Sequence, residues 1–148
     1  MRKLGVDEFT PKHYKEIFLL AKSWWEKISP IPLIEEDVYR CIDIGKELGG
    51  AWVDNNDNII GYYFLTIYPH PFNLGYTVGD LASICIKEEY RSSTLFLRMI
   101  TDIISTCNLY EVDELNFSDT IQRPLSSVMK KLEFEQTGMT YRRKIYGS

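Results

Sequence analysis

Residues 81–100 join an apolar strand, a short charged turn and an amphipathic helix without a break. The segment reads Leu81–Ala82–Ser83–Ile84–Cys85–Ile86, then Lys87–Glu88–Glu89–Tyr90–Arg91–Ser92–Ser93–Thr94, then Leu95–Phe96–Leu97–Arg98–Met99–Ile100. A strand that enters a helix through a polar turn directs unpaired backbone N–H groups and the positive end of the helix dipole at one place. Arg91 adds a fixed positive charge there, and Ser92, Ser93 and Thr94 add hydroxyl donors. The segment therefore predicts an anion-binding corner between a sheet and a helix.

Hydrophobic spacing and turn residues predict the other elements. The expected order is a helix from Pro11 to Ile28, a helix from Glu35 to Gly49–Gly50, a hairpin of strands 51–53 and 59–68, a loop at 69–75, a strand that ends at Ile86, a helix from Arg91 to Cys107, a strand at 113–117, a helix at 122–132 and a last strand at 139–145. This order predicts an α+β fold, an α/β/α sandwich with a central mixed sheet and about four flanking helices. No repeat or linker interrupts the 148 residues, so residues 1–148 are expected to form a single domain.

Composition narrows the class of function. The chain has 17 Lys and Arg against 21 Asp and Glu, and this net charge of −4 gives no basic field for nucleic acid. Three widely spaced cysteines and two histidines, with no CxxC pair, predict no metal site and a reducing, cytoplasmic setting. The sequence shows no signal-peptide block and no run of transmembrane length, so no membrane partner is expected.

Two motifs resemble the Gcn5-related N-acetyltransferase family. The strand that ends at Ile86 reaches Arg91 with the spacing of the family's V-x-P-x-x-R segment, and the following turn takes the place of its glycine-rich turn. Residues Val128–Met129–Lys130–Lys131–Leu132–Glu133–Phe134 and Gly138–Met139–Thr140–Tyr141 are similar to the family's C-terminal pattern. The resemblance implies a sheet that splays beside the strand at Ile86. The hydroxyl-rich turn also resembles those of divergent acetyltransferases of tailed phages, which implies a phage-type protein and, in that case, a host-cell cytoplasm.

The resemblance implies acetyl-CoA as cosubstrate and suggests which residues hold it. Backbone groups of Ile84, Cys85 and Ile86 would pair with the pantetheine like an added strand. The residues implied for the pyrophosphate are Arg91, Ser92, Ser93, Thr94, Leu95 and Phe96. Thr94 and Phe96 stand where the family has glycines, which normally let the amides close on the phosphates.

For catalysis, the resemblance implies that Asp80, eleven residues before Arg91, is the base, acting directly or through water. The alternative interpretation is that Val78–Gly79–Asp80 is a turn. Met129 occupies the position of the family's acid tyrosine and has no proton to donate. Tyr63, Tyr68, Tyr76 and Tyr141 are substitutes that the sequence does not rank.

Three functional interpretations follow. The first is an acetyl-CoA-dependent N-acetyltransferase that transfers the acetyl group directly to an unidentified amine on a small molecule or a protein. The second is a catalytically degenerate protein of the same fold that binds a partner or forms part of an assembly, such as a phage particle. The third is an unrelated α+β domain. The sequence does not predict the oligomeric state.

Overall fold

The computed structural model describes residues 1–45, 48–91, 94–118, 126–138, 143 and 145. Its residues group into two compact units, Met1–Ser118 and Asp119–Ser148. The elements are β1 (Arg2–Leu4), η1 (Val6–Glu8), α1 (Pro11–Ile28), α2 (Glu35–Gly45), β2 (Gly49–Val53), β3 (Ile59–His70), β4 (Asn73–Ile86), η3 (Glu88–Tyr90), α3 (Leu95–Leu109), β5 (Glu114–Asn116) and α4 (Ser126–Lys131). All but α4 belong to the first unit. None of the described helices is both long and apolar enough to span a membrane.

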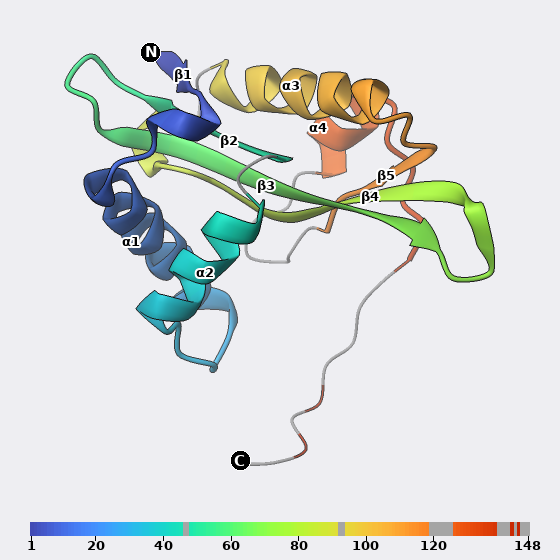
Figure 1. The fold of residues 1–148 in the computed structure, drawn as a ribbon, viewed down its shortest axis with the longest axis horizontal. Helices are drawn as coiled ribbons and strands as arrows, with labels where there is room; N and C mark the ends of the chain where they lie inside the picture. The colour runs from blue at the N-terminus through green and yellow to red at the C-terminus, as the bar shows by residue number, and fades with distance from the viewer. Residues whose placement is uncertain (46–47, 92–93, 119–125, 139–142, 144, 146–148) are drawn as a thin grey trace. The chain divides into compact units, whose positions relative to one another are not determined.

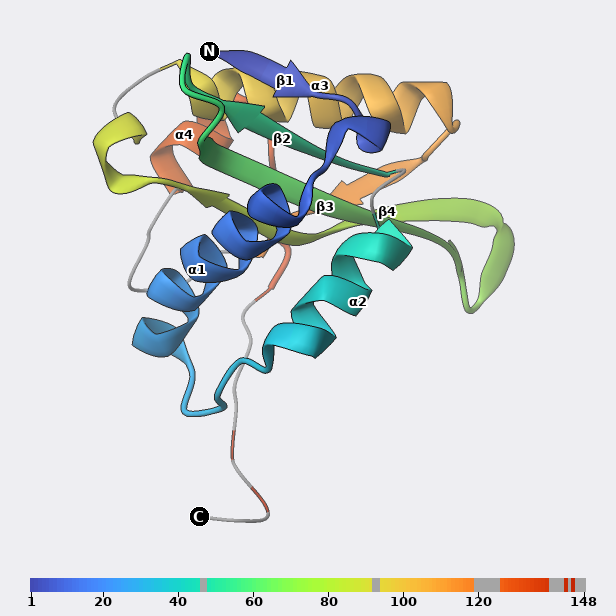
Figure 2. The ribbon, with the colours of Figure 1, turned by 60° about the vertical axis from the view of Figure 1, so that its left-hand side comes forward.

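The first unit is a five-stranded mixed sheet between two layers of helix. The strand order is β1-β2-β3-β4-β5, in which only the β4–β5 pair is parallel. Helices α1 and α2 cover one face and α3 covers the other (Figures 1 and 2). This arrangement confirms the expected α+β class.

Apolar side chains fill both sides of the sheet. The core on the α1 and α2 side consists of Leu4, Ile17, Leu20, Ile42, Ala51, Val53, Ile59, Tyr62, Phe64 and Cys85. On the other side, α3 buries Leu95, Met99, Ile100, Ile103 and Cys107 at helical spacing. Burying both faces of its central strands gives the sheet a fixed register, because a one-residue slip would turn every side chain over.

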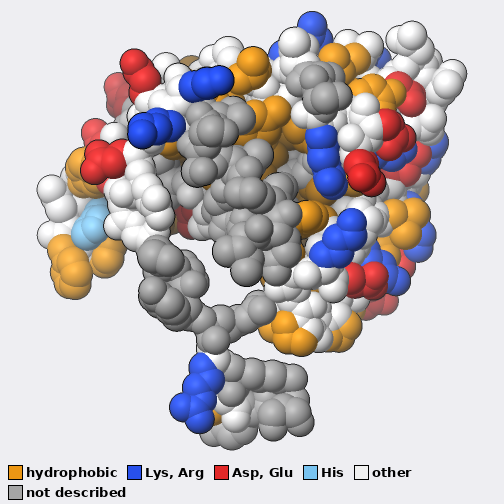
Figure 3. All heavy atoms as spheres, turned by 180° about the vertical axis from the view of Figure 1, so that it is seen from behind, with side chains coloured by type: hydrophobic (Ala, Val, Ile, Leu, Met, Phe, Trp, Pro, Cys, Tyr) orange, Lys and Arg blue, Asp and Glu red, His pale blue; other side chains and the backbone are white. Residues whose placement is uncertain are grey.

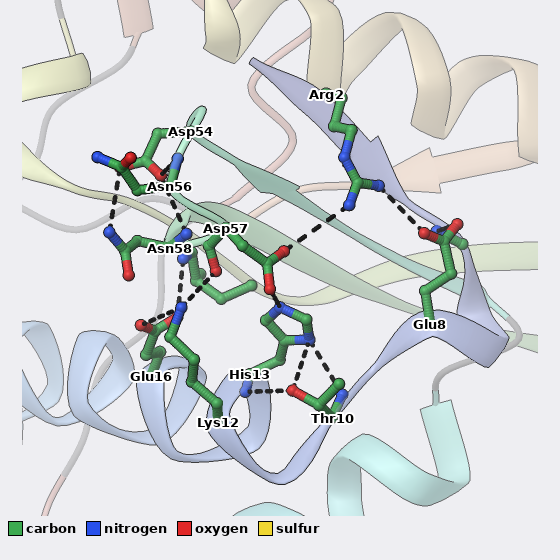
Figure 4. A network of polar contacts seen from close by, with 12 residues as sticks. Arg2, Glu8, Thr10, Lys12, His13, Glu16, Asp54, Asn56, Asp57 and Asn58 are labelled. Atoms are coloured by element: carbon green, nitrogen blue, oxygen red, sulfur yellow. Dashed lines mark hydrogen bonds and ion pairs between the residues drawn. The ribbon is translucent and has the colours of Figure 1, made fainter.

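Helix α1 starts where the sequence predicts it to start. Thr10 is the N-cap: its side chain accepts the His13 N–H, while its own N–H donates to His13 Nδ1 at 3.0 Å (Figure 4). The buried His13 ring reaches across to the β2–β3 turn, with Nε2 3.1 Å from Asp57 Oδ2. Glu16 accepts the N–H of Ile59 at 2.8 Å. These contacts attach the first two turns of α1 to the start of β3.

Several expected boundaries need correction. Gly49 and Gly50 do not end a helix; they begin β2, where Gly49 pairs with Phe64. A Cβ at Gly49 would lie 2.5 Å from the Phe64 ring, so this close pairing requires glycine. The expected loop at 69–75 is wrong, since β3 and β4 continue on either side of Pro71–Phe72. Strand β1 was not expected, because three residues carry too little periodicity.

The predicted C-terminal elements are only partly described. Helix α4 confirms a short helix within the expected range 122–132. The expected last strand at 139–145 falls mostly outside the described residues, as does Tyr141.

Candidate functional site

The two edges of β4 are paired differently. Along one edge, β4 pairs with β3 as far as Ile86. Along the other, it pairs with β5 only at Val78, Gly79 and Asp80. Beyond Asp80, no strand of the described chain pairs with β4 along this second edge. Where a neighbouring strand ends, an extended ligand with amide groups can lie along the strand that continues.

A bulge lies just beyond the end of this pairing. Phe64 is opposite Ser83 and Leu65 is opposite Leu81, so Ala82 is the extra residue on β4. In a regular strand, two residues three positions apart point to opposite faces of the sheet. Because of the bulge, Leu81 and Ile84 instead share a face: both lie opposite residues of β3 that face α3. Bulges of this kind end pairing and redirect side chains next to functional sites.

Asp80 lies at the last position of β4 that pairs with β5. It is opposite Thr66 on β3 and Asn116 on β5, and Thr66 Oγ1 donates to the Asp80 carbonyl at 3.2 Å. The alternative interpretation of Val78–Gly79–Asp80 as a turn is therefore wrong, because these residues are paired on both sides. The half-buried Asp80 side chain lies on the α1 and α2 face, since its partner Thr66 is an even-numbered residue of β3, like Tyr62 and Phe64. Its role as base stays a prediction.

The residues predicted to pair with pantetheine anchor β4 in the core through their buried side chains. Ile84, Cys85 and Ile86 are all buried, and the Cys85 thiol points toward the Leu20 carbonyl of α1, 3.7 Å away. With the side chains packed into both layers, the backbone of this segment forms the edge of β4 beyond its pairing with β5. That is the arrangement an added strand requires.

Arg91 closes the turn after β4. The Lys87 N–H donates to Ile60, and η3 then leads to Arg91. Arg91 Nε donates to the Ile86 carbonyl at 3.1 Å, and its guanidinium lies 5.9 Å from the centre of the Trp24 ring. The side chain therefore ties the turn to the end of β4, at the same place as the start of α3. Ser92 and Ser93 of the predicted site lie outside the described residues.

The N-terminus of α3 is suited to an anion. Thr94 is the N-cap but its side chain makes no capping hydrogen bond, and no acidic residue lies in the first turn. The N-terminal N–H groups of a 15-residue helix carry partial positive charge, which favours an anion nearby. Leu95 is fully buried against Gly61, so it contributes through its backbone, and Phe96 is half-buried.

Two of the tyrosines expected as proton donors, Tyr63 and Tyr76, have hydroxyls that lie away from Asp80. The Tyr63 hydroxyl donates to Asp102 of α3, on the face away from Asp80. The Tyr76 hydroxyl is 3.4 Å from Glu114 at the other end of β4. Tyr62 was not among the expected tyrosines. It is buried, and its hydroxyl lies 3.1 Å from Ser83 Oγ beside the bulge, on the Asp80 face.

A separate hollow lies elsewhere on the first unit. It measures about 460 Å³ and lies between β1, β2 and α3, lined by Lys3, Trp52, Thr94, Leu97, Arg98, Thr101, Asp102 and Ser105. Of the predicted site residues, it includes Thr94 alone. The predicted site is thus the part of β4 beyond Asp80 with a helix N-terminus and is not this hollow.

Solved acetyltransferases share this fold. An acetyltransferase from Trypanosoma brucei is 16% identical with a TM-score of 0.71, and 97% of each chain is covered. A ribosomal-protein-alanine N-acetyltransferase from Brucella melitensis is 12% identical with a TM-score of 0.65, over 97% of this chain and 98% of that one. Glucosamine-6-phosphate N-acetyltransferase from Arabidopsis thaliana is 9% identical with a TM-score of 0.69, over 97% and 95%. No family model and no curated protein matches the sequence.

These likenesses establish the fold, which is that of the Gcn5-related N-acetyltransferases. They favour this fold over the third interpretation, an α+β domain of another fold. The resemblance to phage enzymes stays a prediction.

Proposed function

We propose that this protein is an acetyl-CoA-dependent N-acetyltransferase that transfers an acetyl group directly to an amine. One observation carries the proposal: the pairing of β4 with β5 ends at Asp80, and β4 then leads, through Arg91, to the N-terminus of α3, where the Thr94 side chain makes no capping hydrogen bond. The fold supports it, because acetyltransferases share this architecture at TM-scores of 0.65 to 0.71.

The chain has groups that fit the two parts of such a cofactor. The backbone of β4 beyond Asp80, where β5 no longer pairs with it, has the extended form that suits the amides of pantetheine. The first N–H groups of α3, with Arg91 beside them, suit a pyrophosphate, as do the predicted Ser92 and Ser93. When bound, acetyl-CoA supplies an activated acyl group on a thiol that leaves readily.

Asp80 is the proposed base. An amine attacks a carbonyl only after it has lost the proton that its ammonium form carries, and the Asp80 carboxylate takes that proton directly or through one water. The Ser83 hydroxyl, hydrogen-bonded to Tyr62, stands on the same face and offers a proton for the departing thiolate. These hydroxyls replace the acid that Met129 does not provide.

A second candidate function is a protein of this fold that binds without catalysis. Thr94 and Phe96 at the glycine positions, with Met129 at the tyrosine position, favour it. The two candidates differ in turnover, since a binding protein holds acetyl-CoA or a partner without releasing free thiol.

Isothermal titration calorimetry with acetyl-CoA tests the proposal. We expect binding at sub-millimolar concentration, and we expect Arg91→Ala to weaken it by about 1–3 kcal/mol, the loss of a charge-assisted contact. Arg40→Ala is the matched control, because Arg40 is an exposed arginine of α2 whose removal should leave affinity unchanged. Absence of binding at about 1 mM, a Kd that corresponds to a binding free energy of only about 4 kcal/mol, would contradict the proposal. Equal affinity of wild type and Arg91→Ala would contradict it as well.

Thiol release separates the two candidates. Wild type and Asp80→Asn are incubated with acetyl-CoA and a panel of primary amines, and free CoA thiol is measured colorimetrically. Release that depends on an amine and falls at least about a hundredfold in Asp80→Asn supports the enzyme. Binding of acetyl-CoA with no release for any amine supports the binding protein.

A further inference from the structure

The outer parts of β3 and β4 extend beyond the other strands. Strand β2 pairs with β3 only as far as Phe64, and β5 pairs with β4 only from Val78. Residues 66–77 therefore form a two-stranded ribbon that lies beyond the strands paired with β3 and β4 (Figures 1 and 2), and at its base Thr77 bonds to Asp113, just before β5. An isolated two-stranded ribbon is marginally stable in water, so this one is a candidate to contact a partner.

The ribbon carries exposed aromatic and aliphatic side chains. Phe72 at the turn is 93% exposed and Leu74 is 75% exposed, while Tyr68 is also exposed. His70 holds the group together, with its ring 5.9 Å from that of Phe72 and 6.3 Å from that of Tyr76. Figure 3 shows hydrophobic side chains and a histidine gathered at this end of the molecule. Contiguous exposed apolar side chains of this kind mark interaction surfaces.

The charge around the ribbon has one sign. Residues 66–86 and 107–118, which make up the ribbon, the rest of β4 and the segment around β5, contain no Lys or Arg. Glu111, Asp113 and Glu114 are exposed there. Asp113 accepts the Thr77 N–H at 2.7 Å, so the acidic segment lies directly against the ribbon.

The pKa of Tyr76 responds to these carboxylates. It is raised above its ordinary value, first by burial, then by the charge and hydrogen bond of Glu114, and then by the charge of Asp113. The carboxylates therefore face the aromatic side of the ribbon. Aromatic faces next to carboxylates attract Lys and Arg side chains.

We propose that this ribbon docks a lysine- or arginine-rich polypeptide segment that presents its amine to Asp80. The inference rests on the proposed function, since it names the class of acceptor. Asp80 lies on β4 itself, about 23 Å along the strand from Asn73 at the ribbon's tip, as seven residues at about 3.3 Å each imply. A small amine covers a fraction of that length, whereas a segment of about seven extended residues covers it all.

The charge also decides between partners. A second copy of the chain would bring like carboxylates together, and nucleic acids and anionic lipids would be repelled. A basic polypeptide alone matches both the carboxylates and the aromatic rings.

Fluorescence anisotropy with a labelled decapeptide of alternating Lys and Ala tests the inference on the full chain at low salt. The double variant Phe72→Ala/Glu114→Gln should lower the affinity about tenfold, the combined loss of a cation–π contact and a rim charge. The matched control is Ile44→Ala/Glu26→Gln, which removes an exposed apolar residue of α2 and an exposed carboxylate of α1. The control should bind the peptide as wild type does, and both variants should keep the wild-type melting temperature.

The inference is overturned if wild type does not bind the peptide, or if the ribbon variant binds it with the wild-type affinity. It is also overturned if spermidine displaces the labelled peptide as well as unlabelled peptide does, or if sedimentation shows a dimer that Phe72→Ala dissociates. Calorimetry with acetyl-CoA separates this failure from that of the proposed function. Intact acetyl-CoA binding without peptide binding overturns the ribbon inference alone, and peptide binding without acetyl-CoA binding supports the ribbon while contradicting the proposed function.

Discussion

At the scale of single residues, Tyr63 shows how burial and one charge define the role of a side chain. It is almost fully buried, its hydroxyl donates to Asp102, and Lys3 Nζ lies 2.6 Å from the same carboxylate. Burial first, and then the hydrogen bond to Asp102, raise the pKa of Tyr63 far above 10. Tyr63 therefore joins β3 to α3, and it is not a proton donor for the site.

The raised pKa of Tyr63 predicts a specific alkaline loss of stability. A folded-state pKa above the unfolded value of about 10 stabilises the fold fully below pH 10, and this contribution disappears as pH rises toward the folded value. Tyr63→Phe should lower the melting temperature at pH 7. Its difference from wild type should shrink as pH rises from about 9 to about 11, one unit on either side of the unfolded pKa of about 10. Differential scanning fluorimetry measures both, with the half-exposed Tyr110→Phe as control. A difference that stays constant with pH would contradict this account.

At the scale of elements, the distance between α3 and the sheet depends on Gly61. A Cβ there would lie 3.1 Å from Leu95 Cδ2, 3.3 Å from the Cys85 carbonyl and 3.4 Å from Met99 Sδ. Leu95 and Met99 are completely buried and have little room to move. Gly61 thus lets α3 begin directly over the end of β4, where the proposed pyrophosphate site lies.

We expect Gly61→Val to destabilise the protein by about 1–3 kcal/mol, the usual cost of overpacking a filled core. Urea unfolding measures it. Gly75→Ala on the ribbon is the control, because its Cβ would meet only Asn73 Oδ1, at an ordinary 3.5 Å. Equal unfolding midpoints for the two variants would show that α3 does not need the close approach.

At the scale of the whole molecule, residues 1–148 are proposed to be one folding domain. The sheet and its two helical layers belong to Met1–Ser118, and Asp119–Ser148 is too short to bury a core of its own. Differential scanning calorimetry should therefore show one cooperative transition with equal calorimetric and van't Hoff enthalpies. Two resolved transitions would mean that the chain has two domains.

The sequence alone determined the elements whose periodicity is long. The limits of α1, the class of the fold, the strand that ends at Ile86 and the order of strand, turn and helix around Arg91 all follow from local spacing and capping, which act between near neighbours. The family's fold followed as well, because two motifs were recognisable at the correct separation.

Tertiary structure decided what local spacing does not encode. Gly49 lies in a strand because it pairs with Phe64 of β3, and the extra residue Ala82 shows only in the register against β3. The pairing of Tyr62 with Ser83 joins residues 21 positions apart. The site beyond Asp80 and the acidic aromatic ribbon likewise depend on where β2 and β5 stop pairing, and such non-local contacts arise only when the strands come together.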